Sequence, residues 1–189
     1  MHRRTLLKSL TAIPLLGVWA ARARARSPVT TGEKTVEQLQ KNWKALLADG
    51  AEVATSAEPL KRPNVEWRKI LTAAQYDVLR NEGTERPGSS PLDHEKRPGV
   101  FVCAGCSLPL FTSAMKFDSG TGWPSFFTTI PGALGTSRDF KLLLPRTEYH
   151  CARCGGHHGH VFDDGPEPTG LRYCNNGVAL RFIPKTGKA

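Results

Sequence analysis

Gly99-Val-Phe-Val-Cys-Ala-Gly-Cys106 is the stretch from which the fold can be worked out. Its first residues read as a short buried strand, and they run directly into a Cys-x-x-Cys pair. A second pair, Cys151-Ala-Arg-Cys154, is followed by Gly155-Gly156. Two such pairs supply the four thiolates of a tetrahedral zinc site. We therefore expect one structural zinc ion, held by Cys103, Cys106, Cys151 and Cys154.

Disulfide bonds are the alternative for these four cysteines. The 44 residues between the two pairs exceed the spacing usual in zinc fingers. In an oxidising compartment the same cysteines could close bridges within or between the pairs. Export of a folded, metal-loaded protein would instead preserve the zinc site, because the metal binds before the chain leaves the reducing cytoplasm.

The segments around the cysteine pairs predict a mainly β fold with N-terminal helices. Helical spacing of apolar residues predicts one helix over 36–47 and a second helical segment over 65–81, where Thr72 and Gln75 form a capping box. Glycine, proline and serine make 83–99 a loop. Short apolar or alternating runs separated by turn residues predict strands at 99–102, 108–111, 140–144, 147–150, 160–162 and 178–183.

The first 25 residues have the layout of an export signal. Arg3, Arg4 and Lys8 precede an apolar run over 10–21, and small-x-small cleavage sites follow it. The arginine pair resembles a twin-arginine signal, which predicts export from a bacterial cytoplasm to the periplasm. The run is shorter than the ~20 residues needed to span a bilayer, so contact with the membrane is expected only during export, although an uncleaved anchor is the alternative. We expect residues 26–64 to be an extension or linker with a possible helix, and 65–186 to form the folded domain that carries the function.

Charge argues against a nucleic-acid partner. The formal net charge is +9, but five of the 26 basic residues lie in the first 25 positions. Removal of that segment leaves 21 basic and 17 acidic residues, a weak excess that lacks the concentrated basic face of nucleic-acid binders.

Cys174 is the fifth cysteine and has no partner once four cysteines hold zinc. A lone cysteine is often an apolar filler in a core. Here Arg172 would lie on the same face of a strand and could favour the thiolate, and His157 and His160 could handle protons. These residue types together indicate a nucleophilic thiol site. The histidines could alternatively bind metal or be merely exposed.

These motifs resemble the methionine sulfoxide reductases of the B type, which act on the R epimer. The resemblance covers about 120 of the 189 residues. Its motifs are 67–71, 83–85, the two cysteine pairs, 116–120, 122–126, 159–162, 172–174 and 180–184.

The resemblance implies two small antiparallel sheets of the β-tent type, a structural zinc and attack by Cys174. It gives His157 and His160 the protonation of the sulfoxide oxygen, makes Arg172 and Asn176 supporting residues, and places the substrate methyl group against Trp123. From residue type alone, Trp123 could equally be a core residue. The implied substrates are oxidised proteins, with free methionine sulfoxide as a weaker candidate.

The sequence departs from the family at Thr121. Many members have a resolving cysteine in the pattern Ser-Gly-Cys-Gly-Trp, where this chain reads Ser119-Gly-Thr-Gly-Trp123. The sulfenic acid on Cys174 must then be reduced from outside, by a thioredoxin-like protein or a small thiol. Gly88 and Gly177 are two further departures. The rival hypotheses are a zinc-binding module without catalysis and a thiol–disulfide exchanger that uses the Cys-x-x-Cys pairs.

Overall fold

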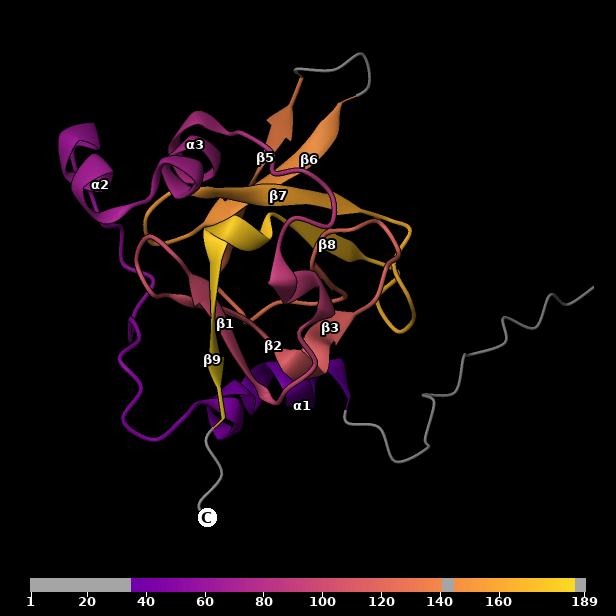
Figure 1. Ribbon diagram of the computed structural model, residues 1–189. Helices are drawn as coiled ribbons and strands as arrows, with labels where there is room; N and C mark the ends of the chain where they lie inside the picture. The colour runs from indigo at the N-terminus through magenta and orange to yellow at the C-terminus, as the bar shows by residue number, and fades with distance from the viewer. Residues whose placement is uncertain (1–34, 141–144, 186–189) are drawn as a thin grey trace, which may run out of the picture. The chain divides into compact units, whose positions relative to one another are not determined.

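The computed structural model describes residues 35–140 and 145–185 (Figure 1). Its helices are α1 (Val36–Lys41), α2 (Asn64–Ile70) and α3 (Ala73–Asn81), with short 3-10 helices at Trp43–Leu46, Pro91–His94, Ser113–Met115 and Gly177–Ala179. The capping box at Thr72 and Gln75 is present, and Thr35 with Gln38 forms another at α1. Within the described residues, no helix has the length and apolar character needed to cross a membrane.

Two antiparallel sheets make up the rest of the domain, which confirms the mainly β fold class. The first has the strand order β2-β1-β9 and the second β3-β4-β8-β7-β6-β5. The strand bounds are β1 Gly99–Cys103, β2 Pro109–Thr112, β3 Lys116–Phe117, β4 Ser125–Phe126, β5 Leu134–Asp139, β6 Arg146–Cys151, β7 His157–Phe162, β8 Arg172–Asn175 and β9 Leu180–Pro184.

Most of one predicted strand lies outside the described residues. The sequence predicted a strand over 140–144, but Phe140 lies outside any strand and 141–144 are outside the described residues. The strand in this region is β5, which pairs along its whole length with β6. Its sequence, Leu-Gly-Thr-Ser-Arg-Asp, has a single apolar side chain, Leu134, and is half exposed, so no apolar alternation indicates a strand there.

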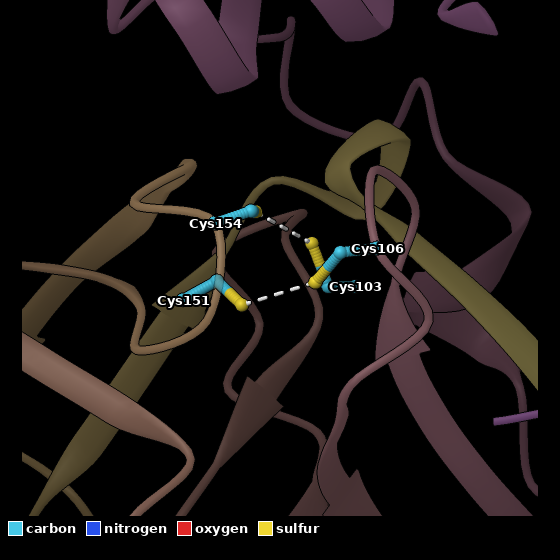
Figure 2. A group of neighbouring side chains, drawn as sticks. All are labelled: Cys103, Cys106, Cys151 and Cys154. Carbon is cyan, nitrogen blue, oxygen red and sulfur yellow. Dashed lines mark hydrogen bonds between the residues drawn. The ribbon is translucent and has the colours of Figure 1, made fainter. Parts of the chain in front are cut away.

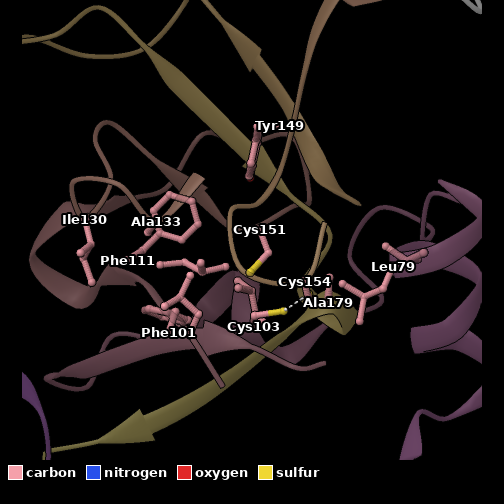
Figure 3. Close-up of a cluster of buried hydrophobic side chains, with 14 of the residues drawn as sticks. Leu79, Phe101, Cys103, Phe111, Ile130, Ala133, Tyr149, Cys151, Cys154 and Ala179 are labelled. Carbon is pink, nitrogen blue, oxygen red and sulfur yellow. Dashed lines mark hydrogen bonds between the residues drawn. The ribbon is translucent and has the colours of Figure 1, made fainter. Parts of the chain in front are cut away.

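The core lies between the two sheets and contains a cluster of aromatic side chains among aliphatic residues (Figure 3). Phe111 stacks on Phe126 with ring centroids 4.1 Å apart, and Phe101 meets Phe126 edge to face at 5.0 Å. Such pairs contribute about 0.5–1.5 kcal/mol each beyond the area they bury. Tyr149 of β6 closes this cluster from the second sheet.

The N-terminal segment covers the outer face of the three-stranded sheet. Val100, Val102 and Ile183 point away from the main core, and the segment from Trp43 to Val53 packs on them. β1 is therefore buried on both faces, as its uninterrupted apolar run indicates.

A strap, defined here as residues 51–62, continues from this cover toward both cysteine pairs. Its Ala54 N–H donates to the Ser107 carbonyl at 3.0 Å, beside the first pair, and its Leu60 N–H donates to the Arg153 carbonyl at 2.6 Å, inside the second. The Arg153 side chain returns a hydrogen bond to the Ser56 carbonyl. The strap is therefore bonded to the domain that follows it and is not a free linker.

Candidate active site and metal centre

The four paired cysteines sit on two turns of the same design. In the first, the Ser107 N–H donates to the Cys103 carbonyl at 2.9 Å, and in the second the Gly155 N–H donates to the Cys151 carbonyl at 2.9 Å. Ser107 and Gly155 both adopt positive φ, which lets each turn fold back over its thiols. One turn extends β1 of the first sheet and the other joins β6 to β7 of the second.

The two turns bring the four sulfur atoms together (Figure 2). The Sγ atoms of Cys103 and Cys154 are 3.7 Å apart, those of Cys106 and Cys151 are 3.5 Å apart, and all four lie within 4.8 Å of one another. A disulfide needs about 2.05 Å. Tetrahedral zinc with bonds of about 2.3 Å sets its sulfur atoms roughly 3.8 Å apart, so the site fits a zinc ion that joins the two sheets.

Cys174 lies in the middle of β8, between two strands. Its direct partners are His160 on β7 and Ser125 on β4. The thiol is partly exposed and lines a pocket of about 140 Å³. The other residues of this pocket are Thr84, Trp123, Arg146, Gly159, His160, Phe162, Asn175 and Asn176. A sulfur that opens into a pocket beside a histidine is suited to nucleophilic attack and not to filling a core.

Burial raises the pKa of the Cys174 thiol. The positive charge of Arg172 and the hydrogen-bonding groups of Arg172 and Thr121 lower this pKa and so oppose the effect of burial. Arg172 has the expected position, but it also makes two 2.8 Å hydrogen bonds to the Asp164 carboxylate. The Asp164 carboxylate offsets part of the positive charge that the sulfur would otherwise experience. The resting site is therefore a protonated thiol that needs help to ionise.

A β-bulge brings His157 and His160 to the same face of β7. Tyr149 pairs with Gly159, whereas the next residue, His150, pairs with His157, so His158 is the extra residue. The rings of His157 and His160 are consequently 5.6 Å apart, centroid to centroid. Regular alternation at a separation of three residues would have placed them on opposite faces.

Each of these two histidines is held by a carboxylate. His157 Nδ1 is 2.7 Å from Glu148 Oε1, and His160 Nε2 is 2.8 Å from Asp139 Oδ2. Asp139 also accepts a 2.6 Å hydrogen bond from Arg146. Burial lowers the pKa of His160, although Asp139 acts against this, so the imidazole is neutral at neutral pH. Only His160 of the pair lines the Cys174 pocket, whereas the neighbouring His157 is not part of its lining.

Trp123 forms a wall of the pocket and is only partly buried, so it is not a core residue here. Its indole N–H donates to the Glu85 carbonyl at 3.2 Å, which fixes the ring against the loop at 83–88. The same loop is anchored at Gly88, whose N–H donates to the Gly122 carbonyl at 2.7 Å. Gly122 has φ +84°, and a Cβ there would lie 2.9 Å from the Gly88 nitrogen.

Asn176 is a buried brace between this loop and β7. Its Oδ1 accepts from the Glu85 N–H and its Nδ2 donates to the His158 carbonyl, both at 2.9 Å. The Glu85 carboxylate in turn accepts from the N–H groups of Gly177 and Val178. Ser90 leaves no room for a side chain at Gly177, which accounts for glycine at this departure from the family.

Several residues of the site escaped the sequence analysis. Asp139, Glu148 and Asp164 orient the two histidines and Arg172, and Phe162 lines the pocket with its ring 4.4 Å from the Arg172 guanidinium. Strand register brings these residues to the site, and register cannot be read from one sequence. Glu85 had a signal, since it stands in the Gly83-Thr-Glu85 motif, but no role was assigned to it.

A histidine-lined thiol pocket, together with a four-cysteine metal centre in the same domain, defines a zinc-containing thiol enzyme of mainly β fold. A family model described as the SelR domain matches residues 71–184. Relatives named peptide methionine sulfoxide reductase MsrB are similar over the same region. The protein from Agrobacterium fabrum is 50% identical over 126 residues, which cover 66% of this chain and 93% of the relative.

Two further relatives of that name support the assignment. The protein from Methanosarcina barkeri is 50% identical over 124 residues, or 65% of this chain and 87% of the relative. The one from Pseudomonas entomophila is 54% identical over 121 residues, or 64% and 92%. The chain belongs to the SelR family, that of the B-type methionine sulfoxide reductases, as its motifs indicated.

Proposed function

We propose that this protein reduces methionine (R)-S-oxide residues in proteins to methionine. The observation that carries the proposal is the position of Cys174, whose sulfur opens into a pocket between His160 and Trp123. A zinc-binding module without catalysis would have no use for this pocket. The name of the relatives, peptide methionine sulfoxide reductase, describes the reduction of methionine sulfoxide in peptides.

The reaction balances with Cys174 alone as the reductant of the first step. The sulfur attacks the sulfoxide sulfur, the S–O bond breaks, and the oxygen ends on Cys174 as a sulfenic acid while methionine leaves. The thiol is oxidised and the sulfoxide reduced by two electrons. The proton of the thiol ends on the transferred oxygen, so no other reactant is consumed.

His160 is the group placed to handle that proton. A neutral imidazole can donate one N–H while its other nitrogen accepts, and Asp139 holds the ring in position. His157, held by Glu148, lies next to His160 and supports its position. The indole of Trp123 provides the apolar surface for the substrate methyl group. Arg172 assists ionisation of the sulfur, and Asn176 shapes the pocket without itself giving or taking a proton.

Regeneration of Cys174 requires two thiols from outside. The first condenses with the sulfenic acid, forming a mixed disulfide and water, and the second displaces it as a disulfide and restores the thiol. The four other cysteines are the zinc ligands, and Thr121 stands in the position of the family's resolving cysteine. A thioredoxin-like protein or a small thiol would supply the electrons.

Export to the periplasm completes the proposal. Residues 1–25 carry the twin-arginine-like pattern and lie outside the described residues. Residues 26–64 then precede a catalytic domain at 65–186. The net charge of the chain without residues 1–25 is low, which gives no reason to expect a nucleic-acid partner.

The test is turnover of separated R and S epimers of protein-bound methionine sulfoxide, with dithiothreitol as reductant. We expect reduction of the R epimer only, and a rate at background for Cys174→Ser. Zinc content and circular dichroism serve as controls that the variant is folded. Full turnover by Cys174→Ser, or reduction of the S epimer alone, would refute the proposal.

A further inference from the structure

Three hydroxyl groups form a chain beside the reactive cysteine. Ser119 Oγ lies 2.8 Å from Thr121 Oγ1 and 2.8 Å from Ser125 Oγ. The chain ends on a fixed acceptor, because the Ser125 hydroxyl donates to the Trp123 carbonyl at 3.0 Å. The Thr121 N–H also points to Ser119 Oγ at 3.4 Å, which helps to hold the turn closed.

The other end of the chain lies beside Cys174. Ser125 is the direct cross-strand partner of Cys174, which sets the turn at 119–125 alongside β8. Thr121 belongs to this turn, and its hydroxyl is placed to act on the Cys174 thiol as a hydrogen-bonding group that lowers the pKa of the thiol. Thr121 is not among the residues that line the pocket, so a substrate in the pocket need not displace it.

The direction of the hydrogen bonds depends on the charge of the sulfur. A hydroxyl donates one hydrogen bond and accepts up to two. When Cys174 is a thiol, it can donate to Thr121, and each hydroxyl in turn donates to the next until Ser125 donates to the Trp123 carbonyl. When Cys174 is a thiolate, Thr121 must donate to the sulfur, and the Ser119 hydroxyl becomes available as the donor to Thr121 Oγ1.

We propose that Thr121 is a positioning residue that donates a hydrogen bond to the Cys174 thiolate, and that Ser119 and Ser125 hold its hydroxyl in that orientation. The proposal deepens the proposed function, on which it rests, by assigning a task to the residue that stands in place of a second cysteine. It gives the buried sulfur a neutral donor in addition to Arg172, whose charge is shared with Asp164.

The experiment measures the ionisation of Cys174 directly. Zinc-loaded full-length protein is alkylated with iodoacetamide across a pH series, and mass spectrometry follows the modification of Cys174 itself. The variants are Thr121→Val, which keeps the shape and removes the hydroxyl, and Thr121→Ser, which restores it. Thr136→Val is the matched control, because Thr136 is exposed on β5.

We expect the pKa of Cys174 to rise by about one unit in Thr121→Val, the size of shift produced by losing one hydrogen bond to a charged group. Thr121→Ser should return it to within about 0.3 unit of wild type, and Thr136→Val should not change it. A Thr121→Val value within about 0.3 unit of wild type, or a Thr121→Ser value equal to that of Thr121→Val, overturns the proposal.

A second variant protects the test against misfolding. Ser119→Ala removes the hydroxyl that orients Thr121 and should raise the pKa of Cys174 by a smaller amount than Thr121→Val does. If the pKa of Cys174 does not rise, the role given to the three hydroxyl groups is overturned. R-sulfoxide turnover is measured in parallel on each variant. If the wild-type protein does not reduce the R-sulfoxide but the variants show the expected shifts in the pKa of Cys174, the proposed function is refuted and the role of Thr121 stands.

Discussion

Replacement of Asn176 by alanine distinguishes a structural brace from a participant in the chemistry. Asn176 is 4% exposed, and its side chain accepts from the Glu85 N–H and donates to the His158 carbonyl. The His158 carbonyl also accepts from the Asn176 backbone N–H at 2.8 Å, so alanine leaves only the Glu85 N–H without its partner. A buried polar group left without a partner costs about 1–3 kcal/mol. We therefore expect the free energy of unfolding to fall by about 1–3 kcal/mol, and Tm by roughly 2–12 °C.

Urea denaturation of zinc-loaded Asn176→Ala, followed by fluorescence and circular dichroism, measures this loss. Asn81→Ala is the matched control, because Asn81 is exposed at the end of α3 and bonds only across the surface to Asp77. It should change stability by less than about 0.5 kcal/mol. A catalytic rate that collapses in Asn176→Ala while the unfolding free energy stays within that limit would show that the reasoning is wrong.

Three further outcomes are expected. Cys106→Ser should reduce zinc content to near zero and lower Tm, because the tetrahedral site loses one of its four thiolates; atomic absorption and calorimetry measure both, and retained stoichiometric zinc would contradict the assignment of ligands. Thr121→Cys should form a disulfide with Cys174 after oxidation by substrate, seen by peptide mapping under non-reducing conditions, and failure to detect it would count against their proximity. Burial lowers the pKa of His158 from 6.5 to about 4. The unfolded chain therefore binds this proton first, so stability present above pH 6.5 is lost as the pH falls, by about 1.4 kcal/mol at pH 5.5. The pKa of His160 is also lowered by burial, so His160 adds to the loss in both proteins. Urea titrations at pH 7.5 and 5.5 should therefore show a loss that is about 1.4 kcal/mol smaller in His158→Gln than in wild type, and equal pH dependence in both would exclude His158 as a source of the loss.

The zinc ligands and the helix caps could be predicted from the sequence because both depend on local spacing. Two Cys-x-x-Cys pairs define a ligand set whatever path the chain takes between them, and Thr72 with Gln75 forms its capping box within one helical turn. The strand at β1 was predictable for a similar reason. Its residues are buried on both faces, so they form an unbroken apolar run.

The arrangement around the thiol could not be predicted in the same way. Asp139 reaches His160 from a strand 21 positions earlier in the chain. The bulge at His158 arises from pairing with β6, and nothing in the local sequence marks it. Arg172 was predicted to favour the thiolate, but its ion pair with Asp164 was not, and burial leaves the pKa of Cys174 raised. Long-range register determines each of these features.

The strap has a consequence for the order in which the domain assembles. It precedes both cysteine turns in the chain but bonds to both, and its contact between Ser56 and Arg153 spans 97 residues. Contacts of such high sequence separation form late, since the ribosome must release residue 153 before they can close. We expect interactions that are absent from the folding transition state to act on the unfolding rate. A weakened strap should therefore leave refolding speed almost unchanged and shorten the lifetime of the native state.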